Sequence, residues 1–113
     1  MDEDEAFYKE QYDYMEQEFK DAKFCVCFSI DELDEVISKE KSIVVVNTFC
    51  FCYGEALKGR RRFYVIHNDK MTLRNIIHSL IEQGIEPKCN HQFLEGIDAW
   101  GDNDTQFELS WGS

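Results

Sequence analysis

The sequence predicts an α+β fold: an antiparallel sheet of about five strands with helices, in the ferredoxin-like (split βαβ) order, preceded by an acidic N-terminal helix. Three segments carry apolar residues at helical spacing, and five have the β-branched, aromatic or alternating pattern of strands. After the first helix the order is strand, helix, strand, strand, helix, strand, with one strand added. Because this order does not fix which strands pair, a differently connected α+β sheet is the alternative.

Residues 6–22 are predicted to form the first helix. Acidic residues at 2–5 favour the positive end of its dipole, and Lys20 and Lys23 suit the opposite end. The apolar side chains recur at steps of four and three, on one stripe: Tyr8, Tyr12, Met15, Phe19 and Ala22. This stripe can dock on the chain's own domain or on a partner.

A short strand over 23–28 and a second helix are expected next. Ser29 and Glu32 match a capping box, in which each side chain bonds to a free backbone amide of the other residue. The helix is expected to end near Glu40 and to bury Leu33, Val36 and Ile37.

The segment 42–53 predicts a long central strand, because it is rich in β-branched and aromatic residues and is apolar on both faces. Residues 54–60 form a connection, and 61–67 form the next strand.

A third helix is predicted between Thr72, which can cap it, and Gly84, which can end it in the left-handed conformation. Its buried stripe comprises Leu73, Ile76, Ile77, Leu80 and Ile81. Two last strands, over 89–100 and 105–111, are joined by a Gly-Asp-Asn-Asp turn.

The length of 113 residues and the hydrophobic content of 43% fit a single domain over 1–113. We divide it into an acidic amphipathic helix over 1–22 and an α+β core over 23–113. The longest uncharged run, 42–54, is too short to span a bilayer, and the N-terminus lacks the basic and apolar parts of a secretory signal. We therefore expect a cytoplasmic protein, in the host cytoplasm if it is viral, with reduced cysteines.

Cysteine and histidine occur in three close pairs: Cys25 and Cys27, Cys50 and Cys52, and Cys89 and His91. Both residue types bind zinc, but residues two apart in a strand are about 6.6 Å apart, and the tighter C-x₂-C spacing does not occur. We therefore expect no metal and no cofactor. The first four of these cysteines are expected to pack between sheet and helix.

Candidate catalytic groups are few. Cys89 and His91 share one face of a predicted strand, but nothing in the sequence supplies an oxyanion hole or a third member. Phosphate-binding glycine loops and the common hydrolase motifs do not occur. We expect no enzymatic activity and assign no catalytic residue.

A basic run over Arg60–Arg62 leads into Phe63 and Tyr64, at a position similar to the basic and aromatic third strand of RNA-recognition modules. The run lacks the glycine and the spaced aromatics of that motif. The net charge of −11 would also repel phosphates. RNA or nucleotide binding through Arg60–Arg62 is therefore the third choice of function.

The negative charge is concentrated at the amino end. Residues 1–40 contain fourteen acidic residues and four lysines, whereas residues 41–113 contain nine acidic and eight basic residues. A helix over 2–21 would have nine carboxylates, with an average spacing along its axis of about 3.3 Å. This spacing is close to the roughly 3.4 Å between phosphates of one DNA strand.

Small acidic α+β chains without catalytic motifs resemble, in composition, the anti-CRISPR-like inhibitors that phages use against host defence systems, some of which mimic nucleic acid. We expect a protein-binding or inhibitory protein that occupies a basic surface of a partner, such as a nucleic-acid-binding protein, without contacting nucleic acid or a membrane itself. The predicted partner-binding residues are Tyr8, Tyr12, Asp13, Glu16, Glu18, Asp31, Glu32, Asp34 and Glu35. The alternative is a structural module that forms homo-oligomers through its aromatic stripe.

Overall fold

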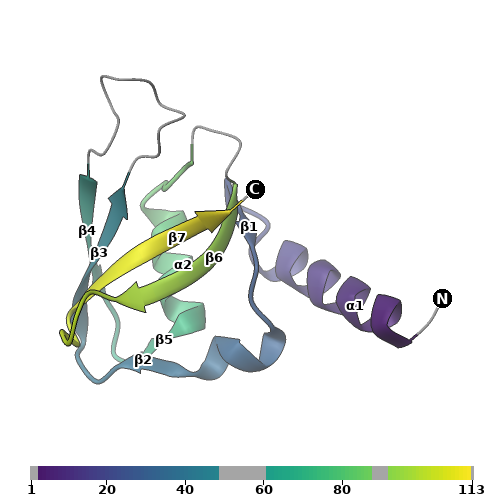
Figure 1. Ribbon diagram of the computed structural model, residues 1–113, viewed down its shortest axis with the longest axis horizontal. Helices are drawn as coiled ribbons and strands as arrows, with labels where there is room; N and C mark the ends of the chain where they lie inside the picture. The colour runs from purple at the N-terminus through teal and green to yellow at the C-terminus, as the bar shows by residue number, and fades with distance from the viewer. Residues whose placement is uncertain (1–2, 49–60, 88–91, 113) are drawn as a thin grey trace.

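The computed structural model describes residues 3–48, 61–87 and 92–112. Its elements are α1 (Glu3–Glu18), β1 (Cys25–Val26), the 3₁₀ helix η1 (Ile30–Asp34), β2 (Val36–Ser38), β3 (Ser42–Thr48), β4 (Arg61–His67), β5 (Met71–Thr72), α2 (Leu73–Glu82), β6 (Phe93–Ala99) and β7 (Gln106–Gly112). Helix α2 lies behind the main sheet, and α1 extends away from the edge near β1 (Figure 1). The fold is therefore α+β, as the sequence predicts.

The main sheet has five strands in the order β1-β6-β7-β3-β4. The hairpin β6–β7 and the pair β3–β4 are antiparallel, whereas β1 runs parallel to β6 and β3 runs parallel to β7. The prediction of an antiparallel sheet is wrong, because the C-terminal hairpin lies between β1 and β3 and each of its strands has a parallel neighbour. The ferredoxin-like order is not confirmed.

The predicted second helix, from Ser29 to Glu40, is also wrong. Only the 3₁₀ helix η1 forms there, and the Ser29 side chain makes no cap hydrogen bond. The β-branched residues Val36 and Ile37 instead enter strand β2, which pairs with β5 in a second, two-stranded sheet. β-Branched side chains lose rotamer freedom in helices and pack well on a pleated surface, so these residues favour the strand over the helix.

The predicted helix over 73–83 is confirmed. Thr72 caps α2 by accepting a hydrogen bond from the Asn75 amide, with 3.2 Å between the two atoms. Beyond its end, Gly84 takes a φ of +72°, and Ile85 donates a backbone hydrogen bond to Leu80. This arrangement ends the helix and folds Ile85 back onto the core.

Strand β3 occupies the predicted central position, between β7 and β4. The part of the predicted strand after Thr48, the connection over 54–60 and residues 89–91 lie outside the described residues. Asn47 is buried in β3 and accepts a hydrogen bond from the Trp111 indole at 2.8 Å. This bond pairs the Trp111 N–H with the Asn47 side-chain oxygen beside the apolar core.

The hydrophobic core lies between the main sheet and the helices. It joins the apolar face of α2 to one face of β3, β4, β6 and β7, and it also receives two residues from the end of α1 and its turn. Its largest fully buried side chains are Leu33, Ile43, Val45, Ile66, Met71, Ile76, Ile77, Leu80 and Leu94.

Candidate protein-binding surface

Helix α1 has one half that docks on the core and one half that does not. Near its end, Met15 is 5% exposed and Phe19, which follows the helix, is 4% exposed. Tyr8, in the first half of α1, is 69% exposed, and Tyr12, in the second half, is still 55% exposed, although both belong to the same predicted stripe. The helix is longer than the part of the core on which it packs, so its N-terminal half projects from the body of the molecule (Figure 1).

Hydrogen bonds hold the docked half in place. Gln11 accepts a bond from the Ile30 amide of η1 at 2.7 Å, which ties the helix to the 3₁₀ turn. Arg74 of α2 donates to Glu18 at 2.6 Å and to the Tyr14 hydroxyl at 3.0 Å, and it also pairs with Asp34 of η1. One guanidinium therefore joins α1, η1 and α2.

The Glu18 carboxyl is held in its charged form at this junction. Burial on its own raises the pKa of Glu18, but the Tyr14 hydroxyl, the Arg74 guanidinium and the nearby His78 ring outweigh it and lower the pKa below the ordinary 4.5. The side chain is only 19% exposed. Glu18 therefore offers a partner little surface and contributes mainly to helix docking.

The other predicted partner-binding residues lie on the outside of the same region. Tyr8, Tyr12, Asp13, Glu16, Asp31, Asp34 and Glu35 are exposed, and Glu32 is half-buried. Tyr12 donates a hydrogen bond to Glu16 at 2.7 Å, and this bond raises the pKa of the Tyr12 hydroxyl above 10.0. Gln11 and Arg74 thus bring the acidic residues of η1 beside those of α1.

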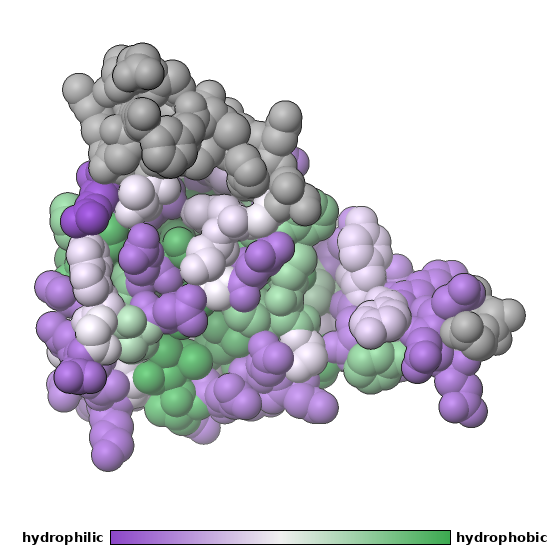
Figure 2. All heavy atoms as spheres, in the orientation of Figure 1, coloured by the Kyte–Doolittle hydropathy of each residue, from purple (hydrophilic) through white to green (hydrophobic). Residues whose placement is uncertain are grey.

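The projecting half of α1 is mainly hydrophilic, with less polar side chains among the charges (Figure 2). It contributes the exposed aromatic residues Phe7 and Tyr8, whose rings meet edge to face at 5.8 Å between centroids. Over its whole length α1 has seven acidic residues against Lys9. Exposed aromatic rings surrounded by carboxylates are suited to contact with arginine and lysine side chains.

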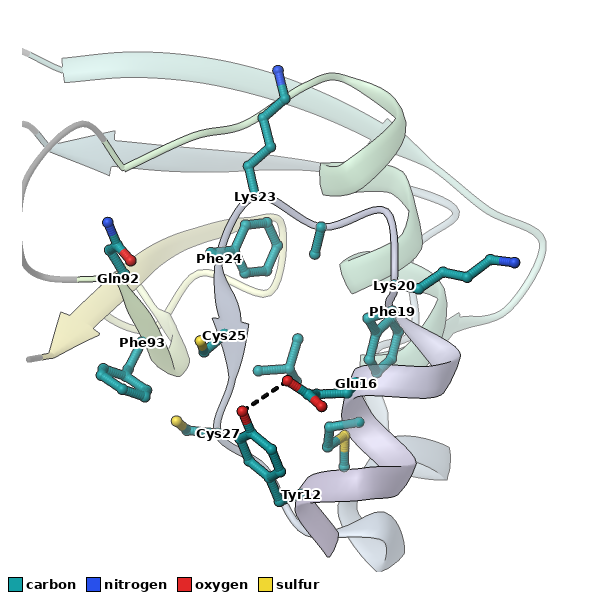
Figure 3. Close-up of a pocket in the computed structure, with 13 residues that line it drawn as sticks. Tyr12, Glu16, Phe19, Lys20, Lys23, Phe24, Cys25, Cys27, Gln92 and Phe93 are labelled. Carbon is teal, nitrogen blue, oxygen red and sulfur yellow. Dashed lines mark hydrogen bonds between the residues drawn. The ribbon is translucent and has the colours of Figure 1, made fainter.

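A groove of about 550 Å³ separates α1 from β1, and the sequence did not reveal it. Side chains from the docked half of α1 form one wall, β1 and the residues before it form the other, and Gln92 and Phe93 lie at the far side of β1 (Figure 3). Most of the lining is apolar, including Met15, Phe19, Phe24, Val26 and Phe93. No sequence motif marks this groove, because it depends on how the helix meets the sheet edge.

Cys25 and Cys27 line this groove, and both side chains are exposed. The prediction that they are buried between sheet and helix is wrong, because β1 is an edge strand and the helix docks beside it. Partial desolvation of the thiol by neighbouring groups, followed by the nearby Cys25 and Glu95, raises the pKa of Cys27 above 9.0. Cys50 and Cys52, expected to be buried with them, lie outside the described residues, as do Cys89 and His91.

The structure also bears on the basic run and on the possible metal site. In the basic run, Arg61 lies over the ring of Trp100, with its guanidinium carbon 4.9 Å from the ring centroid, whereas Arg60 lies outside the described residues. Within residues 3–48, 61–87 and 92–112, no three His, Cys, Asp or Glu side chains gather closely enough to hold a metal ion.

In the same ranges, none of the helices has both the length and the apolar character needed to cross a membrane. Comparison of the chain with protein-family models, with curated proteins and with solved structures gives no significant match.

Proposed function

We propose that this chain is a protein-binding domain that presents α1 to a basic surface of a partner and inhibits the partner by occupying that surface. The observation that carries the proposal is the division of α1: its C-terminal half is anchored by Met15, Phe19 and Arg74, while its N-terminal half stands clear of the core. A helix anchored in this way can reach a partner without unfolding any part of its own domain.

The charge supports a basic partner. Seven carboxylates along the sixteen residues of α1 give roughly one per 3.4 Å at the standard helical rise, similar to the phosphate spacing of a DNA strand. The four acidic residues of 31–35 lie beside the helix through the Gln11 and Arg74 contacts. A partner that normally binds nucleic acid has the complementary surface, so mimicry of nucleic acid is the form of inhibition we favour.

The exposed aromatic residues can supply affinity that charge alone does not. Rim charges mainly set the association rate and specificity, whereas buried aromatic side chains carry most of the binding energy of many interfaces. Phe7, Tyr8 and Tyr12 lie within the acidic part of α1 and are available for this role. We expect them to pack against the stems of basic side chains of the partner.

The test is to recover partners from lysate of the organism that produces this chain and to identify them by mass spectrometry. The immobilised chain is compared with a double variant, Asp13→Lys with Asp31→Lys, which reverses charge on α1 and η1 without touching Arg74. We expect basic proteins to be retained by the wild type, to be released between about 0.05 and 0.5 M salt, and to bind the variant at least about tenfold more weakly.

The matched control reverses the same number of charges elsewhere. Glu82 lies on α2 and Asp102 in the β6–β7 turn, which is far from α1 (Figure 1). The variant Glu82→Lys with Asp102→Lys should retain the same partners as the wild type. Equal losses in both variants, or binding that salt does not weaken, would contradict the proposal.

Homo-oligomerisation is the second candidate function, and the exposure of Phe7, Tyr8 and Tyr12 is the observation that favours it. The net charge of −11 opposes it, because the acidic helices of two copies would repel. Sedimentation distinguishes the two functions: a stable oligomer that becomes monomeric on Tyr12→Ala would establish oligomerisation and displace the first proposal.

A further inference from the structure

Cys25 and Cys27 direct their thiols to the same face of the segment that contains strand β1. The residues that alternate with them, Phe24 and Val26, pack in or against the hydrophobic core, whereas both cysteine side chains are exposed. Successive side chains of a strand point to opposite faces, so the two thiols lie on the face that the core does not occupy. Figure 3 shows both sulfur atoms on the side of β1 nearer Phe93. The two thiols are therefore neighbours at an accessible edge of the sheet.

The pairing of β1 with β6 keeps this segment extended. The Cys25 amide donates to the Gln92 carbonyl at 2.8 Å, and the Cys27 amide donates to the Leu94 carbonyl at 3.0 Å. In such a strand the Cα atoms of residues two apart are separated by about 6.6 Å. Side chains in strands lean along the strand in a direction that depends on their rotamer, so the two sulfur atoms can approach each other more closely than the two Cα atoms do.

This spacing distinguishes between metal geometries. A tetrahedral zinc ion with Zn–S bonds of about 2.3 Å needs two sulfurs about 3.8 Å apart and two further ligands. A linear ion with bonds of about 2.2 Å to two sulfurs needs them about 4.4 Å apart and needs no further ligand. Among the side chains that the structure describes, no third His, Cys, Asp or Glu comes close enough to share a metal ion with the pair. The pair therefore suits linear coordination.

The surroundings of the pair favour a soft ion. Phe93 is the register partner of Cys25 on β6, and most of the groove that both thiols line is apolar. Thiolates select soft ions such as Cu(I), whereas magnesium and calcium prefer oxygen ligands. The partial desolvation that raises the pKa of Cys27 is reinforced by Cys25 and Glu95, so a bound cation has to displace a proton but then offsets these negative charges.

We propose that Cys25 and Cys27 form a binding site for one Cu(I) ion, held between the two sulfur atoms as a linear dithiolate. The ion displaces one proton from each thiol, two Cu–S bonds form, and copper keeps its oxidation state. The site lies outside the acidic surface of the proposed function and does not depend on it. It gives the chain a capacity to bind Cu(I) in addition to binding a partner.

The first experiment measures the two thiols in the wild-type chain. Cu(I) is titrated without oxygen, in the presence of a chromogenic Cu(I) chelator that outcompetes single thiols, and the cysteines are then alkylated with iodoacetamide. We expect the alkylation of Cys25 and Cys27 to fall in step, by at least about tenfold at saturation, because the bound thiolates are no longer nucleophiles. Tandem mass spectrometry reports each cysteine separately.

Zinc is the matched control ion for this measurement. The same titration with Zn(II), without the copper chelator, should leave Cys25 and Cys27 reacting with iodoacetamide within about twofold of their metal-free rates, because the pair cannot complete a tetrahedral site. Neither titration requires a substitution, so both results stand even if a variant does not fold.

Serine variants test whether both thiols hold one ion. Cys25→Ser and Cys27→Ser each remove one thiol from an exposed position, and Cys89→Ser removes one thiol elsewhere in the chain. We expect the number of Cu(I) ions that the protein withholds from the chelator to fall by one in each of the first two variants and to stay unchanged in Cys89→Ser. Circular dichroism of the three variants checks that they are folded.

Three results would overturn the proposal: a Cys25 or Cys27 thiol that stays reactive with Cu(I), equal protection of the pair by Zn(II), or equal copper binding by all three serine variants. The proposed function is tested separately, because the charge reversal at Asp13 and Asp31 leaves both thiols in place. That double variant should bind Cu(I) like the wild type, whether or not it still recovers partners.

Discussion

Arg74 on α2 donates a hydrogen bond to Glu18 at the end of α1, with Nε and Oε1 2.6 Å apart. The two residues are separated by 56 positions in the sequence, and the same guanidinium also contacts Asp34 of η1. Together with the Gln11–Ile30 hydrogen bond and the burial of Met15, this contact holds the end of α1 against the body. The acidic surface of the proposed function therefore depends on a basic residue of the core domain.

Replacement of Arg74 by methionine should destabilise the fold by about 1–2 kcal/mol, because it removes hydrogen bonds to charged and hydroxyl groups that are partly shielded from solvent. The measurement is the free energy of unfolding in urea. Lys41→Met, at an exposed position before β3, is the control and should change that energy by less than about 0.5 kcal/mol. Equal stabilities of the two variants would show that Arg74 does not anchor α1.

The contribution of Glu18 to stability should depend on pH. Its pKa in the folded protein lies below the ordinary 4.5, so the folded state favours the carboxylate. The stabilisation is therefore complete above pH 4.5 and is lost as the pH falls through the lower folded pKa. The free energy of unfolding of the wild type and of Glu18→Gln should converge below that pH. A difference that stays constant through acid would exclude this role for Glu18.

Loss of an aromatic ring should have different effects in the projecting half of α1 and at Phe19, in the turn just after the helix. Phe19→Ala leaves a cavity where the helix meets the core and should cost about 3–5 kcal/mol. Phe7→Ala removes a ring that is 52% exposed and should change the free energy of unfolding by less than about 0.5 kcal/mol. Thermal or urea unfolding compares the two variants. A large decrease in the free energy of unfolding on Phe7→Ala would mean that the projecting half of α1 packs against the rest of the protein.

Cys27 should react slowly with alkylating agents although its side chain is exposed. The thiolate is the reactive form, and partial desolvation of the thiol, followed by the nearby Cys25 and Glu95, raises the pKa of Cys27 above 9.0. Alkylation by iodoacetamide at pH 8, followed by tandem mass spectrometry, should be slower at Cys27 in the folded protein than in urea. Equal rates in the two states would contradict the raised pKa.

Local signals in the sequence were sufficient to predict several elements. The apolar spacing and the Thr72 cap predicted α2, the β-branched run beginning at Ser42 predicted β3, and the acidic residues at the amino end predicted the charge of α1. These predictions hold because side-chain periodicity and capping act within a few residues. The predicted contribution of Tyr8 and Tyr12 to partner binding remains a proposal.

The way in which these elements meet depends on packing between distant parts of the chain. The C-terminal hairpin inserts between β1 and β3, which makes the sheet mixed, and Val36 and Ile37 join a strand because β5 is available to pair with them. The same packing leaves β1 at an edge, exposes Cys25 and Cys27, and opens the groove beside α1. Strand pairing joins residues that are far apart in the chain, and a local sequence pattern does not determine which strands pair.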